Sequence, residues 1–295
     1  MSSENSEVFT KENLDRYLNE LSKEYKRLGG RNVPVEIILI GGAAVIERYG
    51  FREMTTDVDA IVPAASIMKD AIRRVGSRFG LPEDWLNADF IMTDSYSSRL
   101  HAHSVYYRTF SQVLQVRMIT GEYLVAMKLR AGRKYKNDLS DVVGILAEHE
   151  QRGTPISYEM IDRAVNALYG GWDRFPEHSV TFIQNILENR DYAEIYQEIR
   201  KSEQAAAGVV LEFEQAHPGE IREEKIEAIL EAGSAQGSRK SVLAQLKELK
   251  LQQKAESQDA QQRAISEREK IGSLTVHVYL SGEWLHRRCG RQPII

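Results

Sequence analysis

The spacing of hydrophobic positions changes along the chain near residue 152. Before that point, short apolar runs rich in β-branched residues predict buried strands over residues 35–40, 57–62, 106–108 and 112–119. Apolar residues three and four apart predict helices over residues 9–28, 43–48, 67–79, 122–130 and 138–149. Strands mixed with helices in this order indicate a small mixed sheet covered by helices.

Residues 157–270 show helical spacing almost throughout. Within them, residues 240–270 are polar and lose their apolar stripe, which predicts a solvated helix or a partner-binding arm. Residues 272–295 become β-prone and aromatic. We therefore predict an α+β protein with a mixed-sheet domain over residues 1–152, an all-helical domain or arm over 153–271, and a tail over 272–295.

Charge and cysteine content exclude several classes of protein. The chain has 295 residues and a net charge of −4, which argues against a generally basic nucleic-acid coat protein. The single cysteine, Cys289, excludes an internal disulfide and a cysteine-rich zinc site. The N-terminal segment is polar and no apolar stretch approaches the length of a membrane span, so we expect a cytoplasmic protein without membrane contact.

Two acidic residues, Asp57 and Asp59, interrupt an apolar run that otherwise predicts a buried strand. Residues two apart on a strand point to the same face, so Val58 and Ala60 would face the core while both carboxylates project from the other side. Two ionised carboxylates so close repel each other. A divalent ion such as Mg²⁺ removes this conflict and is commonly shared with substrate phosphates.

A glycine pair, Gly41-Gly42, stands between the first predicted strand and the following helix. Glycines at this position let a phosphate approach the backbone, and the helix N-terminus offers N–H groups and the positive end of its dipole. The chain contains neither the dinucleotide fingerprint G-x-G-x-x-G nor the phosphate-loop motif G-x-x-x-x-G-K-[ST]. The pattern therefore predicts a phosphate cradle of another kind beside a metal-binding acid pair.

These motifs, in this order, resemble the signature of the polymerase-β-like nucleotidyltransferase superfamily. The first part of the resemblance is LIGGAAVIERYGFREMTTDVDAIV, in which fourteen residues separate Gly42 from Asp57. The second part, EYLVAMKLRAGRKYKNDLSDVVGIL, is similar to the lysine motif of the abortive-infection toxin branch, which includes AbiEii-like and minimal nucleotidyltransferases. The resemblance covers residues 35–148 and implies that Lys128 contacts the nucleotide and that Asp138 or Asp141 is the later catalytic aspartate.

The residues themselves leave alternatives open for the basic side chains. Lys128 lies among apolar neighbours, where a lysine finds either an anion such as a triphosphate or a salt bridge to Asp138 or Asp141. The run Arg133, Lys134 and Lys136 can neutralise the phosphates of a nucleotide or an RNA end, or form a solvated loop.

One departure from the superfamily bears on catalysis. Many members carry a third acid on a later strand, whereas residues 112–118 contain glutamines and an arginine but no carboxylate. The third metal ligand is therefore missing, unless Asp138 or Asp141 replaces the strand carboxylate from the following helix.

The resemblance implies an enzyme that uses an NTP with Mg²⁺ or Mn²⁺ to transfer a nucleotidyl group to a hydroxyl of RNA, for example tRNA, or of protein. Asp57 and Asp59 would hold the metals, while nucleotide-binding residues would be Gly41, Gly42, Thr56, Lys128 and Arg133. A toxin–antitoxin or phage-defence role is implied, with an antitoxin or complex partner bound through the helical C-terminal region. The alternative is a catalytically degenerate subunit that serves binding or assembly in a defence complex.

Overall fold

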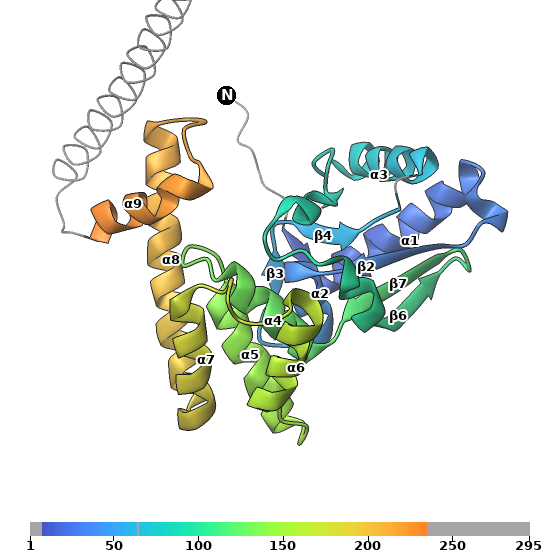
Figure 1. Ribbon diagram of the computed structural model, residues 1–295. Helices are drawn as coiled ribbons and strands as arrows, with labels where there is room; N and C mark the ends of the chain where they lie inside the picture. Colours follow the sequence, from blue (N-terminus) through green and yellow to red (C-terminus); the bar gives the residue numbers. More distant parts are fainter. Residues whose placement is uncertain (1–7, 64, 235–295) are drawn as a thin grey trace, which may run out of the picture. The chain divides into compact units, whose positions relative to one another are not determined.

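The computed structural model describes residues 8–63 and 65–234 (Figure 1). The helical arm predicted over residues 240–270 and the tail predicted over 272–295 lie outside the described residues.

A five-stranded sheet with the order β5-β4-β2-β7-β6 forms the centre of the N-terminal part. Its strands are β2 (Val35–Leu39), β4 (Val58–Ile61), β5 (Leu86–Asn87), β6 (Ser104–Phe110) and β7 (Leu114–Ile119). The sheet is mixed, because β2 pairs parallel to β7 and antiparallel to β4. Two short strands, β1 (Phe9–Thr10) and β3 (Met54–Thr55), pair antiparallel in a separate sheet.

Helices pack on the sheet, and from residue 121 onward the rest of the described chain is helical (Figure 1). The α-helices are α1 (Lys11–Arg27), α2 (Gly41–Arg48), α3 (Ser66–Phe79), α4 (Gly121–Ala131), α5 (Asp138–Gln151), α6 (Tyr158–Tyr169), α7 (Glu177–Asn189), α8 (Tyr192–Ala216) and α9 (Glu223–Ser234). The 3-10 helices are η1 (Gly30–Asn32), η2 (Asp89–Met92) and η3 (Ser98–His103). A mixed sheet followed by helices confirms the predicted α+β class.

Most predicted boundaries shift by a few residues, and two of these shifts have clear local reasons. The first helix begins at Lys11, two residues later than predicted, because Phe9 and Thr10 pair with β3 instead. The hydroxyl of Thr10 then caps α1 by accepting a hydrogen bond from the backbone N–H of Asn13. The predicted strand 57–62 shortens to β4, because pairing with β5 starts at Val58. Asp57 therefore lies in the turn directly before the strand.

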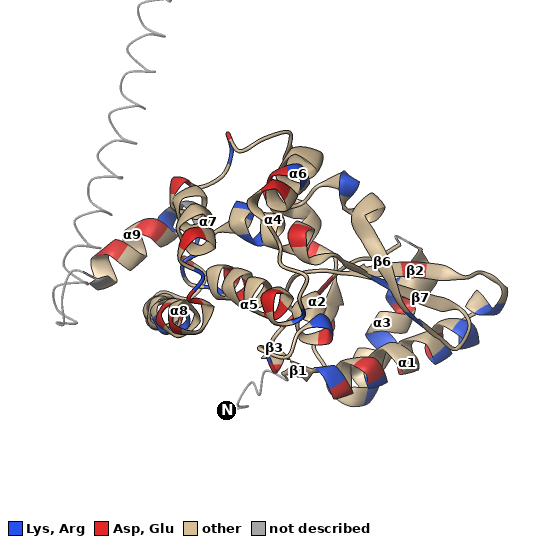
Figure 2. Ribbon diagram, turned by 90° about the horizontal axis from the view of Figure 1, so that it is seen from below, with Lys and Arg blue, Asp and Glu red and all other residues tan. Residues whose placement is uncertain are grey.

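Acidic and basic residues are interspersed on α1, which faces α3 through ion pairs (Figures 1 and 2). Glu24 of α1 is buried, and its carboxylate accepts hydrogen bonds from Arg27, Arg74 and Arg78. These hydrogen bonds, the first of them from Arg27, lower the pKa of Glu24. The carboxylate thus ties the first helix to the third over one side of the sheet.

Helix α2 is buried along most of its length, from Gly42 to Glu47. A Cβ atom on Gly42 would lie 2.3 Å from Oγ1 of Thr55, so the backbone of α2 packs directly against β3. Small residues, Ala43 and Ala44, continue this close packing and are fully buried. The helix that starts at the glycine pair is consequently held in one position between the two sheets.

The N-terminus of α5 is capped by a side chain from α8. The preceding residue, Asn137, makes no side-chain cap, and the backbone N–H groups of Leu139 and Ser140 donate to Oε1 of Glu203 at 2.9 Å and 3.2 Å. Ser140 also donates its hydroxyl to Glu203. Burial raises the pKa of this carboxyl to about 7 in spite of these hydrogen bonds.

The chain divides into two units after residue 208, so the described residues up to 208 belong to one compact unit. Helices α6 and α7 contact α4 and therefore belong to the same unit as the sheet. The domain boundary at residue 152 stays a prediction. None of the helices in the described ranges has the length and apolar character that spanning a bilayer requires.

Another buried acid, Glu47, lies at the end of α2 with 3% of its surface exposed. Its Oε2 accepts a hydrogen bond from the hydroxyl of Tyr107 at 2.7 Å, and Lys11 donates to its backbone carbonyl. Burial, with a contribution from the charge of Asp15, raises the pKa of Glu47 to about 7 from its ordinary value of 4.5. Tyr107 and Glu47 join β6 to α2.

We expect Glu47→Gln to remove part of the pH dependence of stability. Because the pKa of Glu47 is higher in the folded state than in the unfolded state, the folded protein holds this proton more tightly. Ionisation of Glu47 therefore lowers the free energy of unfolding progressively as the pH rises from about 4.5 to about 7. The cost at about pH 8 is on the order of 1–3 kcal/mol, and glutamine, which cannot ionise, avoids it while keeping an acceptor for Tyr107. Urea denaturation at about pH 5 and about pH 8 measures this, since the gain is expected only at the higher pH.

The matched control is Glu83→Gln, which neutralises an exposed glutamate. Parallel stability curves for Glu47→Gln and Glu83→Gln would contradict the prediction.

Candidate active site

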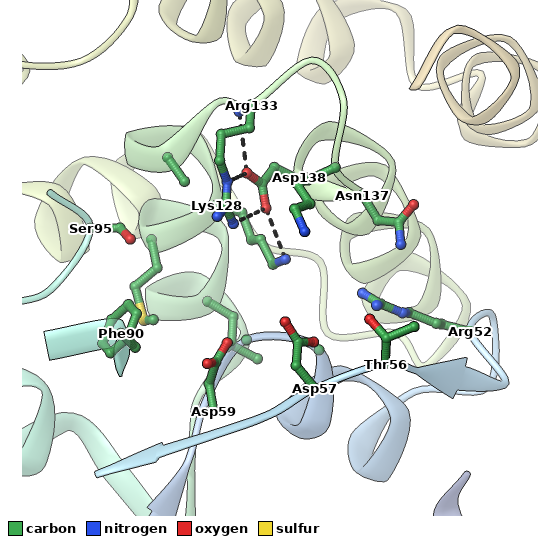
Figure 3. A pocket seen from close by; sticks show the side chains of 16 residues that line it. Arg52, Thr56, Asp57, Asp59, Phe90, Ser95, Lys128, Arg133, Asn137 and Asp138 are labelled. Atoms are coloured by element: carbon green, nitrogen blue, oxygen red, sulfur yellow. Dashed lines mark hydrogen bonds and ion pairs between the residues drawn. The ribbon is translucent and has the colours of Figure 1, made fainter. Parts of the chain in front are cut away.

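A cavity of about 120 Å³ lies where α2, the segment 52–59, α4 and the start of α5 meet. It opens to solvent, and Figure 3 shows its side chains. The lining includes most of the residues predicted as functional: Gly41, Gly42, Thr56, Asp57, Asp59, Lys128, Arg133 and Asp138. Asp141 does not line the cavity but lies behind it, paired to Lys128 and Arg52. The structure thus brings together residues from two distant stretches of the sequence.

Asp57 and Asp59 point into this cavity from the same side (Figure 3). Their neighbours Val58 and Ala60 are fully buried in the core, as strand alternation predicts. The hydroxyl of Thr55 donates to Oδ1 of Asp57 at 3.0 Å. In the described part of the chain, neither carboxylate forms an ion pair with a lysine or arginine.

Burial of Asp59, followed by the negative charge of Asp57, raises the pKa of Asp59 to about 6. The two acids therefore repel each other inside a partly desolvated pocket. A cation brought between them would relieve that repulsion.

The first residue of α2 lies against this acid pair. Gly41 has φ of +55°, a left-handed conformation that favours glycine, and a Cβ atom there would lie 3.0 Å from Oδ2 of Asp59. Any other residue would crowd the space between the helix N-terminus and the carboxylate. The glycine is required both by the backbone turn and by the close approach.

Lys128 is buried on α4, and its ammonium group lies between two carboxylates. Nζ is 3.0 Å from Oδ1 of Asp138 and 2.9 Å from Oδ2 of Asp141. Burial by itself would lower the pKa of Lys128, but the charges of Asp141 and Asp138 outweigh it and hold the pKa above its ordinary value. The sequence left either a bound anion or a salt bridge to Asp138 or Asp141 as the partner of Lys128. The structure shows salt bridges to both aspartates, and Lys128 also lines the cavity.

Arg133 completes the surroundings of Asp138. Its Nε donates to Oδ2 at 2.8 Å, and its backbone N–H donates to the same oxygen at 3.2 Å. Burial alone would raise the pKa of Asp138, but Lys128 and Arg133 outweigh it and lower the pKa to about 2. A carboxylate with so low a pKa is a weak base, which favours a positioning role for Asp138 over proton abstraction.

Arg52 is a cavity residue that sequence reasoning missed. Its Nη1 donates to Oδ2 of Asp141 at 2.7 Å, and its Nη2 donates to Oγ1 of Thr55 at 3.2 Å. Through Thr55 it is connected to Asp57. A single arginine in a polar stretch carries no periodic signal, so only the folded chain reveals its place.

Phe90 and Ser95, which also line the cavity, were missed as well. They come from η2 and the turn after it, a segment in which no motif marks them.

The structure shows no third acid on the later strand where many members of the superfamily carry one. Strand β7 carries no carboxylate, and its Arg117 donates to the hydroxyl of Ser104 at 2.8 Å. In residues 8–63 and 65–234, no group of three or more His, Cys, Asp or Glu side chains is arranged to hold a metal ion. The acid pair therefore has to share a bound ion with ligands other than a third protein carboxylate.

Residues 16–148 match the model of a protein family described as "Nucleotidyltransferase of unknown function (DUF6036)". The match begins within α1 and ends within α5, and so contains the whole five-stranded sheet, the acid pair and Lys128. No curated protein and no solved structure matches the chain. This part of the chain carries a nucleotidyltransferase pattern, as the resemblance to the superfamily implies, whereas no match supports the abortive-infection branch.

We expect Lys128→Met to destabilise the protein strongly. Removal of the ammonium group leaves Asp138 and Asp141 buried with one arginine each, and breaking a buried pair in this way costs about 3–5 kcal/mol. Guanidinium denaturation measures the change in the free energy of unfolding.

Lys136→Met is the matched control, because Lys136 also lines the cavity but its side chain is exposed. Its effect should stay within about 0.5 kcal/mol. Equal effects of the two substitutions would show that the buried pairing of Lys128 contributes nothing.

Proposed function

We propose that this protein transfers a nucleotidyl group from an NTP to a hydroxyl group, with Mg²⁺ or Mn²⁺ as cofactor. The observation that carries the proposal is the acid pair, Asp57 and Asp59, which faces the glycine start of α2 inside a cavity and has no cationic partner in the described chain. The nucleotidyltransferase family match over residues 16–148 supports it.

The residues present fit a divalent ion. Mg²⁺ is commonly bound by one or two carboxylates together with substrate phosphates, so Asp57 and Asp59 suffice when a nucleotide supplies the remaining oxygens. Burial, followed by the charge of Asp57, raises the pKa of Asp59, and an ion bound between the two carboxylates would offset both effects. When bound, the ion supplies charge neutralisation at the phosphates.

The chain's own residues bind and orient the phosphates. The N-terminal N–H groups of α2, at Gly41 and Gly42, face the position of a phosphate, and Thr56 lies beside them. Arg133 and Lys128 place positive charge on the opposite wall (Figure 3). With a volume of about 120 Å³, the cavity accommodates phosphate groups, and the rest of the nucleotide extends through its open side.

Lys128 acts through its fixed position, since Asp138 and Asp141 hold its ammonium group at 3.0 Å and 2.9 Å. In the reaction, the oxygen of the acceptor hydroxyl forms a bond to the α-phosphorus of the NTP. The bond from that phosphorus to the bridging oxygen breaks, pyrophosphate leaves, and the hydroxyl proton passes to solvent. Positioning and charge neutralisation supply most of the acceleration in such phosphoryl transfers.

The acceptor we propose is RNA, with tRNA as one example, or protein, and the biological setting a toxin–antitoxin or phage-defence system. An antitoxin or complex partner would bind the helical C-terminal region. These proposals rest on the resemblance to the abortive-infection toxin branch.

A second candidate function is a binding or assembly subunit with a degenerate active site. The absence of a carboxylate on β7 favours this candidate, because it leaves the acid pair without a third ligand from the sheet.

We expect nucleotidyl transfer to depend on the acid pair. The protein is incubated with each NTP labelled at its α-phosphate, Mg²⁺, and either total RNA or total cell protein. Replacing both acids by asparagine should lower label transfer by about 10²–10³-fold or more, because the amides cannot balance the charge of a metal ion. Asp70→Asn, a change at an exposed carboxylate on α3, should leave transfer unchanged.

Absence of transfer with every NTP, together with tight binding of a partner by the full chain, would favour the binding subunit instead.

Metal binding should follow the titration of Asp59. Because the pKa of Asp59 is raised to about 6, this carboxyl is protonated below that pH and cannot serve as a ligand. We expect Mn²⁺ affinity, measured by electron paramagnetic resonance of free Mn²⁺, to rise about tenfold or more from about pH 5 to about pH 7. Asp59→Asn should bind Mn²⁺ weakly with little dependence on pH, and an equally steep pH profile in that variant would refute the assignment.

A further inference from the structure

A second cleft, of about 410 Å³, shares Arg52 with the candidate active site. One wall is the segment 50–54, which leads from α2 into β3, and the other wall is the first half of α8. It is lined by more polar than apolar side chains, and the proposed reaction assigns it no role.

The α8 wall carries a regular stripe of hydrogen-bond donors. Gln197, Arg200, Lys201 and Gln204 are spaced i, i+3, i+4 and i+7, which places them on one face of the helix. Two cations and two amides thus face the cleft, and the exposed Glu53 is the acidic side chain on the opposite wall. The stripe therefore leaves the cleft with a small excess of positive charge.

Within this stripe, Arg200 has a side-chain nitrogen that is buried yet lacks a partner among the described residues. Its Nη1 is buried from solvent and has no hydrogen-bond acceptor among the described residues. A buried, unpaired guanidinium nitrogen costs free energy, so its retention at a cleft wall points to an anionic ligand. Arg52, by contrast, already donates to Asp141, Thr55 and the carbonyl of Met54.

The two walls of the cleft are held in place relative to the active site. The hydroxyl of Tyr196 on α8 donates to the carbonyl of Phe51 at 3.3 Å, and Glu203 on the same helix caps α5 beside Asp138. An anion bound at Arg200 therefore lies at a set position in a cleft that shares Arg52 with the candidate active site.

We propose that this cleft binds a backbone phosphate of the acceptor, and that the acceptor is consequently a single-stranded RNA rather than a protein. The proposal rests on the proposed transferase function, because it gives the acceptor a second contact beside the reacting centre. Single-stranded RNA offers a phosphate at every nucleotide, whereas a protein acceptor pairs with Arg200 only where an acidic side chain lies next to the modified hydroxyl. A planar guanidinium matches a phosphate in two hydrogen bonds, and Lys201 adds a second charge at the rim.

The test measures binding of a short fluorescein-labelled single-stranded RNA to the full-length protein by fluorescence anisotropy. Arg200→Gln should weaken binding about tenfold at low salt, the loss expected for one charge-assisted phosphate contact. It should also reduce the slope of log affinity against log salt concentration by about 0.7, the value for one phosphate on a single strand. Arg73→Gln, which removes the same charge from exposed α3, should change neither quantity.

Further measurements distinguish an RNA phosphate at Arg200 from the phosphates of the NTP or of the pyrophosphate product. Affinity for a fluorescent NTP analogue should be the same in Arg200→Gln and the parent, and circular dichroism should show the same fold. Binding of pyrophosphate that depends on Arg200 without RNA binding would overturn the acceptor assignment, because the cleft would then take the reaction product. Unchanged RNA binding in Arg200→Gln would also overturn it.

The outcomes also separate this proposal from the transferase itself. RNA binding that depends on Arg200, without label transfer from any NTP, would support the phosphate site and refute the transferase. Label transfer to protein, with no RNA binding that depends on Arg200, would support the transferase and refute the site.

Discussion

The buried ammonium group of Lys128 imposes the constraint on which the site depends. A lysine taken out of water is stable as a cation only if carboxylates surround it, and Asp138 and Asp141 lie at 3.0 Å and 2.9 Å from its nitrogen. Each aspartate in turn contacts one arginine, Arg133 or Arg52. The result is a continuous series of ion pairs from the loop before α5, through α4, to the segment that leads into β3.

This series separates charge across the cavity. The acid pair, Asp57 and Asp59, projects from one side, Lys128 and Arg133 occupy the other, and Arg52 lies beside Thr56 (Figure 3). Because the cations are already held by buried carboxylates, their positions need no rearrangement when an anion arrives, and such preorganised charge is what catalysis of phosphoryl transfer uses. The same pairing lowers the pKa of Asp138 to about 2, so this aspartate acts by holding its neighbours.

The acid pair and the basic wall are linked through short, specific contacts. Arg52 donates to Thr55, Thr55 donates to Asp57, and the glycine start of α2 leaves room beside Asp59. Helix α8 joins the same structure, because Glu203 caps α5 at the turn that carries Asp138. A helix far along the chain thereby supports the segment that matches the nucleotidyltransferase family model, although that match ends at residue 148.

Much of this arrangement was predictable from local patterns. Apolar runs and helical spacing predicted the α+β class. Strand alternation predicted that Asp57 and Asp59 share one side, and both line the cavity although Asp57 lies just before β4. The glycine pair predicted that a phosphate can approach the backbone, which stays a prediction, although Gly41 adopts a positive φ and lies close to Asp59. These features depend on residues within a few positions of one another.

Other features were decided only by the tertiary structure. The strands β1, β3 and β5 are two residues long, too short for any periodic signal, and exist because their partners lie beside them. Arg52 and Glu203 gain their roles from carboxylate and backbone partners 89 and 64 positions away. Sequence alone therefore predicts which side chains can carry charge or bind a metal ion. The pairing of buried charges depends on packing between distant elements, because a charge removed from water is stable only where the fold provides an oppositely charged partner.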